Sequence, residues 1–367
     1  MQRTKPPFRA DQVGSFLRPE RLKEARARRE KGEITAAQLR TVEDEEIKKL
    51  IKQQEDIGMQ LATDGEFRRT FWHFDFLGGL TGIDLYDHTQ GIQFQGAQTK
   101  AWDIRTVGKI DFPDDHPFLD HFRFLKANTK VVPKMTIPSP TVAHFRAGRI
   151  KISKDVYPDL DQYYEDLGKA YAKAVKAFYD AGCRYLQLDE VFIAMLCDPK
   201  YRDQMVKRGD DPEKLGPLYG HLINAAMSDI PSDMTITMHL CRGNYRSTWQ
   251  GQGGYEKVQE ILFNRINVHG YFMEYDSERA GGFEPLKLLP KNKKVVLGLV
   301  TTKSGQLESK DQIKRRIEEA SRFAPLDQLC LSGQCGFAST EEGNTLAEEE
   351  QWAKLRMIVE VAKEVWG

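Results

Sequence analysis

The segment LDQYYEDLGKAYAKAVKAFYDAGCRYLQLDE, residues 160–190, joins an amphipathic helix directly to a short strand. Apolar side chains recur at helical spacing over 160–182, on a face made of Tyr164, Leu167, Tyr171, Ala174, Val175 and Phe178. The helix ends at Gly182, and RYLQLDE (184–190) is a mostly apolar run that ends in two carboxylates. A helix that leads straight into an apolar strand is typical of α/β proteins with parallel strands.

The same alternation continues along the chain. Strands are predicted at 8–15, 59–65, 130–135, 184–190, 235–240, 268–276, 294–300 and 328–333. Helices are predicted at 36–58, 160–182, 213–229, 254–264, 309–323 and 347–366. Eight parallel strands separated by helices are enough to close a (β/α)8 TIM barrel. The sequence therefore predicts this α/β fold ahead of an open, doubly wound sheet.

Residues 85–123 interrupt the alternation after the second predicted strand. The stretch is too long for an ordinary loop, and its part TKAWDIRTVGKIDFP (99–113) alternates between polar and apolar residues. We expect a β-hairpin insertion there. No internal repeat or linker divides the rest, so one barrel domain over residues 1–367 is predicted.

Composition narrows the class of protein. Lys and Arg total 54, as do Asp and Glu, so no net charge attracts nucleic acid or an anionic membrane. The opening residues contain no signal-peptide core, and no apolar run approaches the ~20 residues that cross a bilayer. Five cysteines are too few and too scattered for a disulfide framework. We expect a soluble, cytoplasmic protein without nucleic-acid or membrane partners.

Four metal-ligand side chains end or follow predicted strands in the carboxy-terminal half. They are His239 and Cys241 in TITMHLCRGN, Glu274 in YFMEYDS, and Cys335 in LSGQCGFAST. His239 and Cys241 are two residues apart, so on an extended strand both point the same way. Each motif alone is weak, because single buried His and Cys residues are common in cores. Together, two thiolates, an imidazole and a carboxylate predict a zinc site.

The charge of this ligand set indicates a type of reaction. Three negative ligands make zinc a poor generator of hydroxide, which disfavours a zinc hydrolase. The same site is well suited to binding an external thiol as a thiolate that remains nucleophilic. The sequence therefore predicts alkyl transfer to sulfur.

Seven short motifs together resemble a known family. They are Val13-Gly14-Ser15, Gln54-Glu55, Asp64-Gly65-Glu66, Gln187-Leu188-Asp189-Glu190, His239-Leu240-Cys241, Glu274 and Gln334-Cys335-Gly336. The chain resembles the catalytic barrel of cobalamin-independent methionine synthase over nearly its whole length, and most closely the short, single-barrel relatives. The resemblance implies a methyltransferase that converts homocysteine to methionine, with 5-methyltetrahydrofolate or another methyl donor. It also implies that the four metal-ligand side chains hold Zn²⁺.

The resemblance further implies how homocysteine binds. Gly14 and Ser15 would hold its carboxylate, while Glu66 and Asp189 would pair with its ammonium group. Glu66 and Asp189 end the second and fourth predicted strands, on the rim where active sites of such barrels lie. Without that placement, a helix cap for Asp189 and a surface acid for Glu66 would be the better explanations.

Three positions depart from the family pattern. His144 stands where the family has a tryptophan that stacks on the donor, and is predicted to contact substrate. Lys303 replaces a proton-donating histidine after the seventh strand, and is predicted to be catalytic. Met195 replaces a glutamate that contacts folate. Full-length synthases also carry an amino-terminal barrel for which we expect no room here, so the donor stays open.

Other interpretations remain. Related zinc barrels alkylate coenzyme M, a thiol without an ammonium group, for which Glu66 and Asp189 would be repulsive. A non-catalytic barrel with structural zinc is the second alternative. The aromatic run Phe71-Trp72-His73-Phe74 and the insertion 85–123 are candidate walls for a donor. The oligomeric state is open, with a homodimer as one option.

Overall fold

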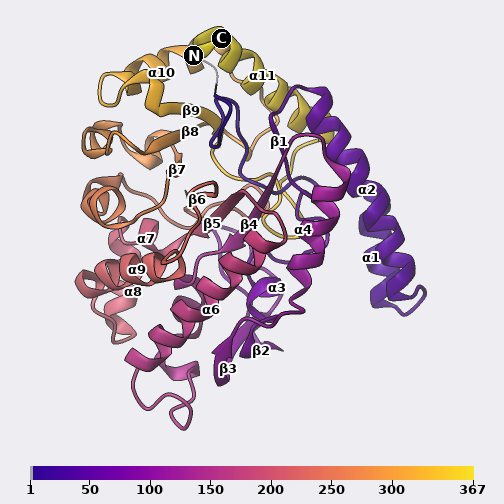
Figure 1. Cartoon of the computed structure of the whole chain (residues 1–367), viewed down its shortest axis with the longest axis vertical. Coiled ribbons are helices and arrows are strands. Elements are labelled where there is room, and N and C mark those ends of the chain that lie inside the picture. The colour runs from indigo at the N-terminus through magenta and orange to yellow at the C-terminus, as the bar shows by residue number, and fades with distance from the viewer. Residues whose placement is uncertain (1–2) are drawn as a thin grey trace.

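The computed structural model describes residues 3–367 and has an α/β fold with a curled parallel sheet among helices (Figure 1). The sheet contains, in spatial order, β1 (Leu61–Ala62), β4 (Val132–Pro138), β5 (Tyr185–Glu190), β6 (Thr235–Leu240), β7 (Gly270–Glu274), β8 (Lys294–Val300) and β9 (Leu329–Gly333). Every pairing is parallel. The predicted TIM-barrel class is confirmed, with seven regular strands instead of eight.

The first predicted strand, residues 8–15, lies between β9 and β1 without forming a regular ladder. Ala10 bridges Leu331 of β9, and Ser15 bridges Gly65 just after β1, both in parallel. The side chain of Asp11 accepts hydrogen bonds from the backbone N–H groups of Phe8, at 2.9 Å, and Gln12, at 2.8 Å. Because these bonds turn the backbone locally, the segment completes the ring without strand geometry.

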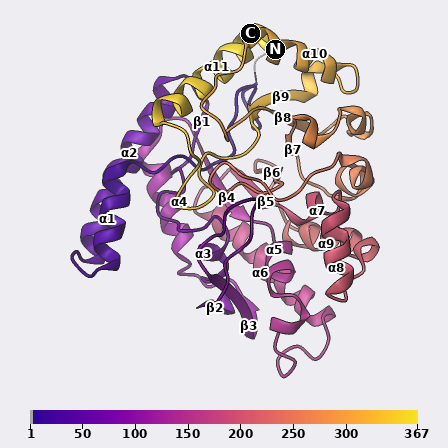
Figure 2. The same ribbon diagram turned by 180° about the vertical axis from the view of Figure 1, so that it is seen from behind.

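The helices run back along the outside of the sheet, as Figures 1 and 2 show from opposite sides. The longer ones are α1 (Glu20–Glu30), α2 (Ala36–Asp56), α4 (Pro117–Asn128), α6 (Asp161–Asp180), α9 (Pro212–Ala226), α10 (Lys310–Ser321) and α11 (Glu348–Trp366). The shorter ones are α3 (Phe74–Leu77), α5 (Thr141–Ala147), α7 (Phe192–Met195) and α8 (Pro199–Lys207). In α6 the buried face runs from Leu167 to Phe178 as its periodicity predicts. Residues 254–264, predicted as one helix, contain only a 3₁₀ turn and the start of a π-helical turn, Ile261–Arg265.

The predicted insertion is an antiparallel pair, β2 (Thr81–Asp87) and β3 (Trp102–Asp111), which forms a sheet of its own. The hairpin is confirmed, but the predicted range 85–123 is shifted. Its last residues belong to α4, which begins at Pro117, where the His116 ring accepts a hydrogen bond from the Phe118 N–H at 3.2 Å. A proline at the first turn and a capping side chain start a helix there.

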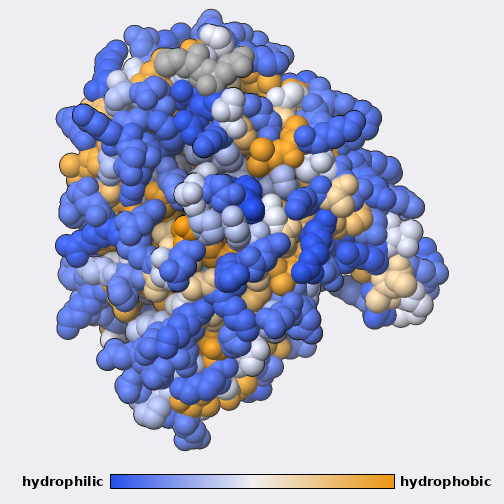
Figure 3. Space-filling view, viewed as in Figure 1, coloured by the Kyte–Doolittle hydropathy of each residue, from blue (hydrophilic) through white to orange (hydrophobic). Residues whose placement is uncertain are grey.

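The C-terminal end of α11 lies at the top of both ribbon views (Figures 1 and 2). Hydrophilic side chains cover most of the face in Figure 3, with apolar ones in small groups. Within residues 3–367, none of the helices combines the length and apolarity that a membrane crossing requires. All five cysteines are free thiols.

Candidate active site

One pocket opens at the carboxyl ends of the strands, the end that carries active sites in barrels of this type. The parallel register makes Asp189 of β5 the direct neighbour of His239 on β6. The predicted site residues on the pocket wall are Ser15, Glu66, Asp189, His239, Cys241 and Cys335. Residues more than 300 positions apart in the chain therefore meet in one pocket because neighbouring strands end at one rim.

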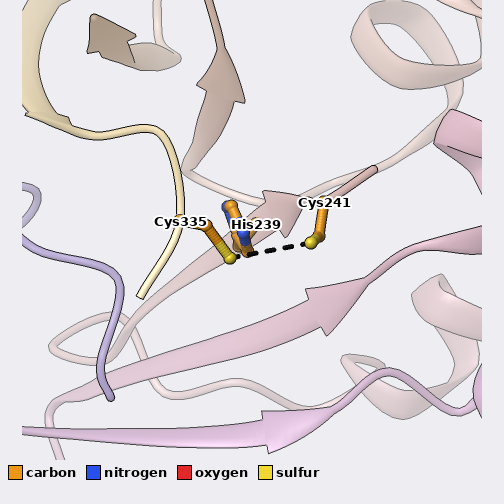
Figure 4. A group of neighbouring side chains, drawn as sticks. All are labelled: His239, Cys241 and Cys335. Atoms are coloured by element: carbon orange, nitrogen blue, oxygen red, sulfur yellow. Dashed lines mark hydrogen bonds between the residues drawn. The ribbon is translucent and has the colours of Figure 1, made fainter. Parts of the chain in front are cut away.

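The two cysteine sulfurs face each other across the pocket floor (Figure 4). The Sγ atoms of Cys241 and Cys335 are 3.6 Å apart, which is too long for a disulfide. Two thiolates bound to one tetrahedral zinc at 2.3 Å would be about 3.8 Å apart. One ligand atom from each of His239, Cys241 and Cys335 lies within 4.8 Å of the other two, and all three residues are buried. This spacing fits a single metal ion.

His239 supplies a second indication that the group fits a metal. Its side chain is 2% exposed, and neither ring nitrogen has a hydrogen-bond partner among residues 3–367. A buried polar group without a partner costs roughly 1–3 kcal/mol, so such groups are rare. A cation bound to one of the ring nitrogens would remove that cost.

Charge within the group also favours a thiolate. A hydrogen bond from Cys241, together with His239 nearby, lowers the pKa of the Cys335 thiol well below its usual range. The same pairing with Cys335 raises the pKa of Cys241. The Sγ of Cys241 also accepts a hydrogen bond from the Gly243 backbone N–H at 3.2 Å. The pairing therefore favours the thiolate form of Cys335 where a cation would bind.

Glu274, the fourth predicted ligand, lies at the end of β7 and is fully buried. Its Oε1 accepts the Arg242 backbone N–H at 2.8 Å, and its Oε2 pairs with Arg279 at 2.8 Å. Although burial raises the pKa of Glu274, the charges of Arg279, Lys303 and Arg242 lower it overall, so the carboxylate is ionised. The structure brings three of the four predicted ligands into one compact group and leaves Glu274 bound to arginine beside it.

Glu66 and Asp189 form a buried acidic pair on the same pocket wall. Glu66 has a positive φ of 61°, uncommon for a residue other than glycine, and the Asp64 side chain binds its N–H at 2.9 Å. Its Oε2 is buried without a hydrogen-bond partner among the described residues. Burial and the charge of Glu66 raise the pKa of Asp189 to about 7. Two carboxylates held this way fit an organic cation.

Gly14 and Ser15 lie beside this pair. A Cβ on Gly14 would stand 2.7 Å from the Thr136 methyl group and 3.2 Å from Oε1 of Glu66, so only glycine allows this close approach. The Ser15 Oγ lies on the pocket wall and accepts the Ala338 N–H at 3.2 Å.

His144 does not reach the pocket. It is 1% exposed, and the hydroxyl groups of Tyr219 and Tyr164 bond its two ring nitrogens, each at 2.9 Å. Burial lowers the pKa of His144 to about 4, so the ring is neutral. The motif comparison could not show that α5 directs this ring between α6 and α9 and away from the pocket.

Lys303 follows β8 and lies behind the cysteine pair. Its Nζ donates to Oδ1 of Asn244 at 2.8 Å and to the Gly243 carbonyl at 3.4 Å. Its charge contributes to lowering the pKa of Cys335. Lys303 is therefore close to the sulfur group without being part of the pocket wall.

The rest of the pocket wall is aromatic or cationic. Phe71, Trp72 and His73 line it, and Phe94 reaches it from the hairpin insertion. Both candidate walls thus contribute to the pocket. Arg146 also lines it, and nothing in its local sequence distinguishes it from the many surface arginines.

Residues 8–364 match the sequence model for the catalytic domain of the cobalamin-independent synthase family. The chain belongs to this family. Two proteins of Bacillus subtilis, YxjG and YxjH, are 52% and 50% identical to it; the alignments cover 100% and 99% of this chain and 97% and 96% of theirs. The methionine synthase of Pyrococcus horikoshii is 24% identical, over 88% of this chain and 84% of its own.

Solved structures agree on the fold. A candidate vitamin-B12-independent methionine synthase from Listeria monocytogenes is 42% identical and superimposes with a TM-score of 0.80, covering 100% of both chains. A B12-independent methionine synthase from Shewanella, in complex with selenomethionine, has a TM-score of 0.71 at 18% identity and covers 96% of each chain. The second likeness concerns the fold alone.

Proposed function

We propose that this protein is a zinc-dependent methyltransferase that transfers a methyl group to the thiol of homocysteine and so forms methionine. The observation that carries the proposal is one pocket with two features: the buried His239–Cys241–Cys335 group and the acidic pair Glu66 and Asp189. The first fits a metal that binds thiols, and the second fits the ammonium group of an amino acid. Membership of a methionine-synthase family supports both assignments.

His239, Cys241 and Cys335 would hold the zinc ion, with Glu274 as the fourth ligand. Bound zinc supplies a deprotonated substrate thiol that remains nucleophilic at neutral pH. To bind the metal, Glu274 would have to turn its carboxylate away from Arg279, which now contacts it at 2.8 Å. Arg242 and Arg279 keep this carboxylate ionised and ready to bind.

The chain's own residues orient the substrate. Glu66 and Asp189 bind the ammonium group of homocysteine, Ser15 binds its carboxylate, and Gly14 leaves room for the pair to approach. Binding of the amino-acid end in this way directs the substrate sulfur toward the cysteine pair. Phe71 and neighbouring apolar residues exclude water, so the reacting groups meet in a fixed geometry.

The leaving group of the donor takes up a proton from Nζ of Lys303 or from water. Lys303 is positively charged next to the sulfur group and is held by Asn244. We further propose that residues 1–367 act as one catalytic domain in the cytoplasm. The acidic pair disfavours coenzyme M as the thiol, because its sulfonate would meet two carboxylates.

The decisive experiment replaces Cys335 with serine. Wild-type protein should contain one zinc per chain and form methionine, and Cys335→Ser should lose both properties. Cys183→Ser is the matched control: that thiol is also fully buried, and it donates to the Tyr185 carbonyl at 3.3 Å, which a serine hydroxyl can do as well. Retention of stoichiometric zinc by Cys335→Ser would refute the ligand assignment.

X-ray absorption separates a catalytic zinc from a structural one. Addition of homocysteine should increase the number of sulfur atoms around the metal by one. An unchanged sulfur count in protein that binds homocysteine would support the non-catalytic alternative.

A further inference from the structure

Arg146 presents an uncompensated positive charge to the active-site pocket. Its Nε is buried without a hydrogen-bond partner, and residues 3–367 offer the guanidinium neither a hydrogen bond nor an ion pair. The Phe192 ring lies under it, with its centroid 5.3 Å away. Partly buried arginines usually have an anionic partner, because a desolvated charge without one is costly.

The acids near Arg146 do not cancel this charge. Asp103 is the acidic group that acts on it most strongly, but Lys151 already forms an ion pair with Asp103. Arg208 adds a further positive charge. Burial lowers the pKa of Arg146 to about 10, so the guanidinium is still protonated at neutral pH.

A second hollow lies beside the active-site pocket at Arg146. Arg146 and Gln250 line both the active-site pocket and the second hollow beside α8. The remaining lining residues of the second hollow are Gln93, Phe145, Lys200, Tyr201, Gln204, Met205 and Arg208. This lining includes three cations and, within the described residues, no carboxylate. An elongated ligand with an anionic end fits two hollows that meet at a cationic side chain.

His73 supplies an independent indication of a ligand near Arg146. Its side chain is 1% exposed, it lines the pocket, and neither ring nitrogen has a partner among residues 3–367. The tilted rings of Trp72 and Phe74 lie against it, with ring centroids 4.5 Å and 4.0 Å away. Burial and the charge of Arg146 keep the pKa of His73 well below its usual value. The neutral ring offers one donor and one acceptor to a polar group of a ligand.

We propose that Arg146 and His73 form the recognition site of the methyl donor, and that this donor is an elongated molecule with a carboxylate or phosphate group at Arg146. The inference rests on the proposed function, since a thiol acceptor at the cysteine pair leaves this part of the pocket to the second substrate. In the transfer, the bond from the donor to its methyl carbon breaks and a sulfur–methyl bond forms. The electron pair of the broken bond stays on the donor.

Charge then separates the classes of donor. A donor with a carboxylate or phosphate gains a favourable charge contact between that group and Arg146. A sulfonium donor begins with a positive charge that Arg146 repels. The structure therefore assigns selection against sulfonium donors to Arg146.

The test is calorimetric titration of zinc-loaded, homocysteine-bound protein with three probes. 5-Methyltetrahydropteroyltriglutamate carries carboxylates, tripolyphosphate carries phosphates, and S-adenosylmethionine carries a sulfonium. At least one anionic probe should bind about tenfold or more tightly than S-adenosylmethionine. Which anion binds identifies the group at Arg146.

Variants locate the binding site. Arg146→Met should weaken the anionic probe about tenfold or more, and Arg146→Lys should restore part of the loss. Lys207→Met is the matched control: it removes an exposed cation of α8 outside both hollows and should change nothing. Homocysteine affinity should be equal in all four proteins.

Three results would overturn the inference: sulfonium binding as tight as anion binding, anion binding that survives Arg146→Met, or a loss of homocysteine affinity in that variant. The last would show that Arg146 holds the substrate carboxylate instead. If Arg146-dependent anion binding persists but none of the donors yields methionine, the proposed reaction fails while the anion site stands.

Discussion

His239 and His144 are buried histidines in two regions of this barrel, and they differ in whether their ring nitrogens have hydrogen-bond partners. The two side chains are 2% and 1% exposed, so burial does not distinguish them. His144, between α6 and α9, has tyrosine hydroxyls on both ring nitrogens. In contrast, neither ring nitrogen of His239, at the end of β6, has a hydrogen-bond partner among residues 3–367. Satisfied hydrogen bonds indicate a core residue, and unsatisfied ones at the pocket indicate a ligand.

The largest expected effect comes from the same substitution at the two positions. His239→Gln should lose zinc and lower methionine formation by about a thousandfold or more, because the ion contributes several kcal/mol to such reactions. His144→Gln should keep its zinc and most of its activity. Metal analysis and initial rates on both variants measure the contrast, and zinc loss in His144→Gln would break it.

Acid should reveal the neutral state of His144. Its pKa is about 4 in the folded protein, against 6.5 ordinarily, so the unfolded chain binds more protons below pH 6.5. The free energy of unfolding should therefore fall as the pH drops from about 6.5 to about 4. His144 accounts for up to about 3 kcal/mol of that loss. Denaturant titrations at pH 7.5 and 4.5 should show a smaller loss for His144→Gln than for wild type; equal losses would contradict the assignment.

Lys303→Met tests the charge beside the sulfur group. Loss of the proton donor should lower kcat by about a hundredfold, while the Michaelis constant for homocysteine and the zinc content stay close to wild type. The matched control is Lys310→Met, a surface lysine paired with Glu360 and Glu364. An unchanged kcat in Lys303→Met would leave water as the proton source.

The acidic pair gives the smallest of these effects. Glu66→Gln removes one charge facing the ammonium group and should raise the Michaelis constant for homocysteine about tenfold, with less effect on kcat. The same change relieves repulsion with Asp189 but also removes the buried ion pair between Glu66 and Arg69, whose atoms are 3.6 Å apart, so the free energy of unfolding should fall as well. A raised kcat with an unchanged Michaelis constant would exclude Glu66 from substrate binding.

Much of this protein follows from local sequence patterns. The period of the apolar residues predicts the helix Asp161–Asp180 and the buried strands, because amphipathic spacing alone determines which face is buried. Polar residues at strand ends predict the rim on which Glu66, Asp189, His239 and Cys335 meet, because parallel strands end on the same side of a barrel. The residue types at that rim then indicate thiol and metal chemistry.

The tertiary structure decided which polar groups are satisfied. Two tyrosines from different helices form hydrogen bonds with His144, and Arg279 and Arg242 bind Glu274. Among residues 3–367, none of the acids forms an ion pair with Arg146. Sequence spacing cannot show these outcomes, because the partners come from distant elements whose approach depends on packing. A buried polar group without a hydrogen-bond partner indicates a binding site. Whether a group lacks a partner can be seen only in the folded structure, because the surrounding residues come from distant parts of the chain.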